Sequence, residues 1–167
     1  HERVEYTFPK QVLGPEATQE QVYGVIMSDA VNAWLMNSMN VMLLAYGQTG
    51  TGKTHTMFGP RESLTSSEVH PDWGLFPRAA HECITTLNKL CSMGELHSGA
   101  AWTLRASATE FYMMETFDLV HGRKPLQMDP DGLPLGADSV EITSVSDLAP
   151  FLDMVSANRT TSGTRMN

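Results

Sequence analysis

Hydrophobic and polar positions alternate along this chain with two different periods, which predict helices and strands in turn. Residues 18–37 predict a helix, because apolar side chains recur there every three or four positions. Thr18 and Gln21 have the spacing of a capping box, in which two side chains satisfy unpaired backbone N–H groups at a helix start. The polar run 37–40 is expected to end this helix.

The next segment, residues 41–46, is apolar and does not alternate. A strand that is covered on both faces has this pattern, so residues 41–45 predict a buried strand of a parallel sheet. A weaker alternation over residues 4–12 predicts another strand, which Pro9 excludes from the centre of a sheet. A glycine-rich loop and a second helix follow the buried strand, and this order of elements predicts an α/β fold.

A polar stretch, residues 59–72, carries several serines and prolines and predicts a surface loop. Trp73 at its end is interpreted as a core residue, and the alternative is a surface anchor. Pro77 is acceptable in the first turn of a helix, and apolar spacing predicts that this helix covers residues 77–92. Gly94 is expected to end it.

The last part of the chain predicts shorter elements. Alternation predicts strands at residues 102–111 and 140–143, and the turn-rich region 122–136 predicts a hairpin. Ser144 begins a second capping pattern, which predicts a final helix ending near Asn158. No repeat or linker interrupts the series, so residues 1–167 are interpreted as one domain.

The composition fits a folded protein and excludes two kinds of partner. Hydrophobic residues make up 41% of the 167 residues and charged residues 18%. No apolar run approaches the roughly 20 residues that cross a bilayer, so we expect no membrane contact. The net charge of -8 argues against a nucleic-acid surface, which requires a basic stripe, and against direct contact of this segment with an acidic polymer.

The chain has two cysteines, Cys83 and Cys91, both in the helix predicted at residues 77–92. Eight residues of helix separate them by about 12 Å along the axis. This distance is too long for a disulfide, so we expect both thiols to be reduced, in core or partly buried positions of a cytoplasmic protein.

Residues 47–54 match the phosphate-binding pattern G-x-x-x-x-G-K-[ST] in full. Glycines let backbone N–H groups approach a phosphate, and the start of the following helix adds unpaired N–H groups and a positive dipole end. Lys53 is expected to place a cation on the β- and γ-phosphates of a nucleotide, and the Thr54 hydroxyl to bind Mg²⁺. The alternative is a glycine turn that matches by chance, which the predicted strand before it and helix after it disfavour.

A longer string, residues 45–57, resembles the phosphate-loop signature of the kinesin motor family over its whole length. Other stretches resemble family segments in the same order, namely residues 17–23, 74–79, 107–112, 118–120, 158–159 and 164–167. The resemblance covers nearly the whole chain. It implies a kinesin-motor-like P-loop NTPase fold, with a central, mostly parallel sheet flanked by helices.

The resemblance also implies ligands and partners. ATP or ADP with Mg²⁺ is the expected cofactor, microtubules are the expected partner of the intact protein, and the cytoplasmic cytoskeleton is the expected location. His55 stands where kinesins often place a side chain against adenine; the alternative is a polar residue in a first helical turn. The implied nucleotide-binding residues are Gly47, Gln48, Thr49, Gly50, Thr51, Gly52, Lys53, Thr54 and His55, with Thr54 as metal ligand.

Several family motifs do not occur in the sequence. It contains neither the Ser-Ser-Arg-Ser-His switch nor the Asp-x-x-Gly-x-Glu switch, and it lacks the basic half that grips microtubules. We therefore assign no catalytic residue and expect this chain to bind nucleotide but to hydrolyse it poorly or not at all. Strands from the absent half belong to the family's central sheet, so either the chain is part of a longer protein, which we favour, or it associates with another copy or a partner.

Three functions are consistent with these patterns. The leading hypothesis is the ATP-binding part of a microtubule-based motor ATPase. The second is a non-catalytic, kinesin-like interaction module, because both switches are absent. The third is an unrelated phosphate-loop NTPase such as a small kinase, which the family-like context at Gln48, Thr49 and residues 55–57 disfavours. Met113 and Met114 replace a polar pair that is common in kinesins and indicate a divergent member.

Overall fold

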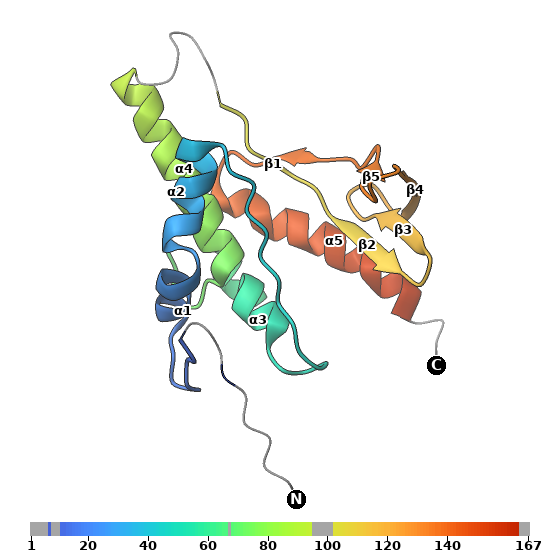
Figure 1. Cartoon of the computed structure of the whole chain (residues 1–167), viewed down its shortest axis with the longest axis horizontal. Helices are drawn as coiled ribbons and strands as arrows, with labels where there is room; N and C mark the ends of the chain where they lie inside the picture. Colours follow the sequence, from blue (N-terminus) through green and yellow to red (C-terminus); the bar gives the residue numbers. More distant parts are fainter. Residues whose placement is uncertain (1–6, 8–10, 67, 95–101, 164–167) are drawn as a thin grey trace, which may run out of the picture. The chain divides into compact units, whose positions relative to one another are not determined.

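The computed structural model describes residues 7, 11–66, 68–94 and 102–163 (Figure 1). The described residues fall into two compact units. The first lies within His1–Ser63 and Val69–Cys83, and the second lies within Leu64–Glu68 and Ile84–Asn167. None of the described helices is both long and apolar enough to cross a membrane.

The first unit begins with two helices where the sequence predicts one. α1 covers Gln19–Ile26 and α2 covers Ser28–Asn37, and Met27 caps both. The predicted capping box is confirmed, because the Thr18 hydroxyl accepts from the Gln21 N–H at 3.2 Å and the Gln21 side chain accepts from the Thr18 N–H at 2.9 Å. The chain leaves α2 at Ser38, whose left-handed φ of 53° ends the helix as expected.

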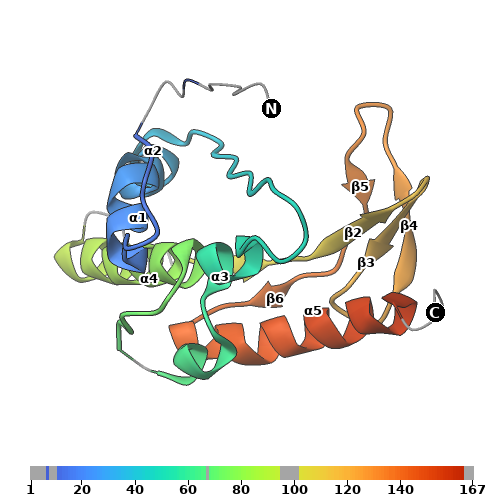
Figure 2. The same cartoon turned by 90° about the horizontal axis from the view of Figure 1, so that it is seen from below.

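The prediction of a strand at residues 41–45 is wrong. The structure has no strand among the described residues of the first unit, and this segment runs irregularly from α2 to the glycine loop (Figure 2). Met42, Leu44 and Tyr46 are 91%, 80% and 95% exposed. A strand needs a hydrogen-bonded neighbour, and no described segment pairs with this one, so apolar composition alone does not make it a strand.

The other strand predicted in this unit, residues 4–12, lies mostly outside the described residues. Thr7, Gln11 and Val12 are described, and none of them belongs to a strand.

Two further helices follow the glycine loop. α3 covers Lys53–Phe58, and α4 covers Leu75–Met93 with Pro77 in its first turn, as predicted. The intervening polar stretch contains a short 3-10 helix, η1 (Arg61–Thr65). Gly94 adopts a φ of 70° and donates its N–H to the Cys91 carbonyl at 3.1 Å, which confirms the predicted end of α4.

The second unit contains two antiparallel sheets. β1 (Arg105–Ala106) pairs with β6 (Val140–Glu141). The other sheet has the order β2-β3-β4-β5, with β2 (Thr109–Tyr112), β3 (Glu115–Asp118), β4 (Lys124–Met128) and β5 (Pro134–Leu135). The strand predicted at residues 102–111 is thus divided, and the hairpin predicted at residues 122–136 is confirmed as β4–β5.

The expected mostly parallel sheet is not found among the described residues, where every strand pairing is antiparallel. Turn length explains this pairing in the larger sheet. Tyr112 pairs with Glu115, so two residues connect β2 to β3, whereas a parallel pair requires a crossover of about a dozen residues or more.

The final helix, α5 (Leu148–Gly163), runs along the strands of the second unit in both views (Figures 1 and 2). It follows η2 (Val145–Asp147), and the predicted capping box between Ser144 and Asp147 is present. The helix continues five residues beyond the predicted end at Asn158. The most deeply buried apolar residues of this unit include Phe117, Leu119, Val120, Ile142, Leu148 and Phe151.

Candidate functional site

The backbone of the glycine loop takes conformations that side chains resist. Gly47, Gly50 and Gly52 have φ values of 154°, 84° and 92°. A Cβ atom at Gly47 would lie 2.7 Å from the Thr51 hydroxyl oxygen, which is too close for an ordinary contact. Gly52 is the N-cap of α3 in the left-handed region, where only glycine is unstrained. The loop conformation therefore depends on glycine at these positions.

The Lys53 ammonium lies against the loop that precedes it. Its Nζ atom donates to the carbonyl oxygens of Gly47 at 2.8 Å and Gln48 at 2.7 Å. The Thr51 hydroxyl donates to the same Gln48 carbonyl at 2.8 Å. These contacts hold the Lys53 ammonium against neutral carbonyl oxygens of the loop. Phosphate oxygens could replace these carbonyls, because hydrogen bonds to charged acceptors are stronger.

The remaining polar side chains of the loop face solvent. Gln48, Thr49 and Thr54 are exposed, and Thr54 is the second residue of α3. Within the described part of the chain, no three His, Cys, Asp or Glu residues are grouped so that they could hold a metal ion. Thr54 carries a hydroxyl oxygen, the type of ligand that Mg²⁺ takes, so this residue fits Mg²⁺ that is held mainly by phosphate oxygens.

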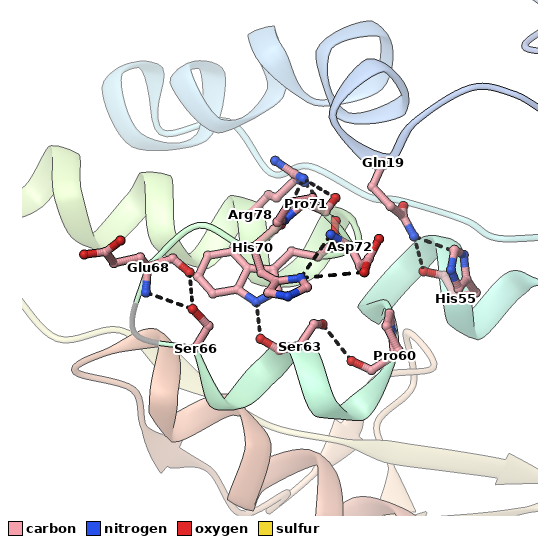
Figure 3. Close-up of polar contacts among 11 residues, drawn as sticks. Gln19, His55, Pro60, Ser63, Ser66, Glu68, His70, Pro71, Asp72 and Arg78 are labelled. Atoms are coloured by element: carbon pink, nitrogen blue, oxygen red, sulfur yellow. Dashed lines mark hydrogen bonds and ion pairs between the residues drawn. The ribbon is translucent and has the colours of Figure 1, made fainter.

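His55, the third residue of α3, is held by a residue that the sequence analysis does not identify. The Gln19 side-chain nitrogen donates to the His55 carbonyl oxygen at 2.8 Å and lies 3.0 Å from His55 Nδ1 (Figure 3). Gln19 is 9% exposed, whereas His55 is exposed. No sequence signal marks this contact beyond the capping box that fixes the start of α1, because 36 positions separate the two residues.

Close backbone contacts hold the end of α3. The Gly74 N–H donates to the Phe58 carbonyl at 3.2 Å. A Cβ atom at Gly74 would lie 2.5 Å from the Phe58 nitrogen, and one at Gly59 would lie 2.2 Å from the Asp72 carbonyl oxygen. These approaches exclude any side chain at the two glycines. They therefore fix the C-terminal end of α3 against the residues that precede α4.

The stretch between α3 and α4 is anchored by Arg78. Its Nε atom donates to the Trp73 carbonyl at 2.8 Å, and its Nη2 atom donates to the carbonyls of Pro71 at 2.8 Å and His70 at 3.2 Å (Figure 3). Trp73 has no exposed surface, which confirms it as a core residue, and its indole N–H donates to the Ser63 carbonyl at 2.7 Å. The polar loop expected between the two helices is therefore bound to α4.

The nine residues expected to bind nucleotide are consecutive and all lie in the first unit, as part of one loop and the first turn of α3. Lys53 and the loop carbonyls are in direct contact, and His55 is bound to Gln19. Thr54 is exposed, as are Gln48 and Thr49 in the loop before it.

Comparison with known proteins places this loop in a family context. The family model described as "Kinesin motor domain" matches residues 1–167. The chain is 30% identical over 181 residues to "Kinesin-like protein KIN-5C" of Oryza sativa subsp. japonica, covering 97% of this chain and 17% of that protein. It is 32% identical over 174 residues to "Kinesin-like protein KIF11-B" of Xenopus laevis, covering 97% of this chain and 15% of that protein. The chain thus spans about a sixth of these relatives.

A solved structure confirms the fold at the level of the family. It is titled "Structure of a fast kinesin: Implications for ATPase mechanism and interactions with microtubules" and matches with a TM-score of 0.69 and 24% identity. The match covers 90% of this chain and 41% of that chain. The fold is therefore α/β and similar to that of this solved kinesin. With the family model matching from the first residue to the last, the chain belongs to the kinesin motor domain family.

Proposed function

We propose that this chain is the nucleotide-binding part of a microtubule-based motor ATPase, and that residues 47–54 bind the phosphates of ATP or ADP with Mg²⁺. The observation that carries the proposal is the glycine loop, in which positive φ values open the backbone and two carbonyls hold the Lys53 ammonium. Membership of the kinesin motor domain family supports the choice of nucleotide and of motor activity. We expect hydrolysis to require switch segments that this sequence does not contain.

Each side chain has a proposed role in binding. Lys53 would exchange its carbonyl partners for phosphate oxygens, and backbone N–H groups from Gly47 to Thr54 would surround the phosphates. The Thr54 hydroxyl would be the protein ligand of Mg²⁺, which when bound neutralises phosphate charge. The exposed ring of His55 would lie against the base. Because this segment carries a net charge of -8, microtubule binding would belong to other parts of the intact protein. The intact protein would be cytoskeletal.

Calorimetric titration with Mg·ADP tests the proposal directly. We expect a micromolar Kd for the wild-type chain, or about -8 kcal/mol, and loss of binding in Lys53→Ala. Lys89→Ala is the matched control, because Lys89 is an exposed lysine of α4 outside the loop. Circular dichroism would establish that all three proteins are folded. Equal binding by the wild type and Lys53→Ala, or no binding by a folded wild type, would exclude the loop as a nucleotide site.

A second candidate function is a non-catalytic, kinesin-like interaction module, which includes association with a second copy of this chain. The exposed apolar side chains of Met42, Leu44 and Tyr46 favour it. Sedimentation of the chain over a range of concentrations would detect self-association. ATP hydrolysis by the intact protein that increases with microtubules would exclude the non-catalytic reading.

A further inference from the structure

We propose that Gln19 is a positioning residue for His55 and fixes the tautomer and the orientation of the imidazole ring. In the proposed nucleotide site, this ring contacts the base. The role of the ring in binding a base rests on the proposed function. The tautomer and the orientation rest only on contacts within the first unit.

The first step is the orientation of the Gln19 amide. Its Nε2 atom lies 2.8 Å from the His55 carbonyl oxygen, and a carbonyl oxygen only accepts hydrogen bonds. The amide nitrogen, rather than the amide oxygen, must therefore face His55. The same carbonyl accepts the N–H of Gly59 at 2.8 Å, so both of its lone pairs are used.

The second step concerns the ring. The same amide nitrogen lies 3.0 Å from His55 Nδ1. Because this nitrogen carries two hydrogens and no acceptor, one hydrogen serves the carbonyl and the other serves Nδ1. Nδ1 is thus an acceptor, and the neutral ring carries its proton on Nε2. The hydrogen bond also restrains the orientation of the ring, because it fixes the position of Nδ1.

The third step is the rigidity and the location of this pair. Gln19 is the first residue of α1, directly after the N-cap Thr18, and its side chain is almost completely covered. His55 follows Lys53 by two positions and is exposed, although its Nδ1 edge is bound. An aromatic ring that is fixed at one edge and open to solvent suits stacking on a nucleotide base. The predicted ligand is therefore a base-bearing nucleotide, rather than pyrophosphate alone.

Nitrogen NMR of the whole chain with ¹⁵N-labelled histidine tests the contact without nucleotide. His55→Gln identifies the His55 signals among the six histidines. In the wild type we expect a pyridine-like Nδ1 and a pyrrole-like Nε2. Gln19→Glu replaces the donor with an acceptor, so Nδ1 should become pyrrole-like. Gln21→Glu is the matched control, because it adds the same charge one half-turn away, where Glu also completes a capping box.

Titration with two ligands then tests the positioning role. Gln19→Ala should weaken Mg·ADP about tenfold, which is the scale of one stacking contact, and leave Mg·pyrophosphate unchanged. Unchanged His55 signals in Gln19→Glu, or equal losses for both ligands in Gln19→Ala, would overturn the proposal. If the wild type binds neither ligand, the proposed function fails and the role of the ring fails with it, whereas the NMR result still decides the tautomer.

Discussion

The phenol hydroxyl of Tyr23 on α1 donates a hydrogen bond to the carboxylate of Glu82 on α4, across 59 positions of sequence. Burial raises the pKa of Tyr23 above its ordinary value, and the hydrogen bond and the negative charge of Glu82 raise it further. An ionised phenol would face a carboxylate at this position. The contact therefore stabilises the first unit only while the phenol keeps its proton.

The Tyr23–Glu82 contact predicts how stability depends on pH. The folded pKa of Tyr23 lies above the unfolded value near 10, so the stabilisation is fully present below pH 10 and is lost as the pH rises further. Tyr23→Phe should cost about 1 kcal/mol at pH 7, and its stability should fall less steeply above pH 10 than that of the wild type. Urea unfolding at several pH values measures both. Tyr46→Phe, at a 95% exposed site, is the control; parallel curves for the wild type and Tyr23→Phe would contradict the prediction.

Replacing Arg78 with lysine should destabilise the stretch between α3 and α4. The guanidinium donates to three carbonyls at once, and an ammonium on a flexible stem cannot reproduce this planar arrangement. We expect a loss of about 1–3 kcal/mol, measured by urea unfolding. Arg105→Lys is the control and should change stability by less than about 0.5 kcal/mol, because its contacts with Ser139 are exposed. Equal effects of the two changes would show that Arg78 is an ordinary surface residue.

Met113 stores strain in the two-residue turn between β2 and β3. It is a non-glycine residue with a φ of 54° and is 83% exposed, so packing does not compensate for the strain. Met113→Asn should raise the unfolding free energy by about 0.5–1 kcal/mol, because asparagine tolerates this region. Thermal unfolding measures the change. Met114→Asn, next to it and without a positive φ, should have no such effect; a lower melting temperature for Met113→Asn would rule out the strain.

The two cysteines should differ in reactivity. Burial raises the pKa of Cys83 to about 11, with a further contribution from the charge of Glu82, whereas Cys91 is exposed. Because the thiolate is the reactive form, we expect one thiol to react rapidly with a disulfide reagent at pH 7.5 and the second only after unfolding. Cys91→Ser should remove the rapid phase. Two rapid thiols in the folded wild type would show that Cys83 is accessible.

Features whose causes are local can be predicted from the amino-acid sequence alone. Thr18 with Gln21, and Ser144 with Asp147, start helices through side chains only three positions apart, and both capping boxes are found in the structure. Gly94 ends α4 because its own backbone can adopt a positive φ. The conformation of the glycine loop belongs to the same class, because its glycines and Lys53 lie within eight residues. The geometry of these features depends only on residues a few positions apart, so the sequence contains all that is needed to predict it.

Other features depend on groups that come together only when the chain folds, and the sequence does not predict them. Residues 41–46 have the composition of a buried strand, yet they form none, because pairing depends on a neighbour that no described segment provides. Gln19 has no marked pattern in the sequence, yet it holds His55 from 36 positions away. The three carbonyls that Arg78 binds lie only 5 to 8 positions before it, yet no local pattern predicts that the chain turns back onto α4 there. Gln19 and Arg78 each donate to backbone carbonyl groups. Which backbone groups these are is known only once the unit has folded.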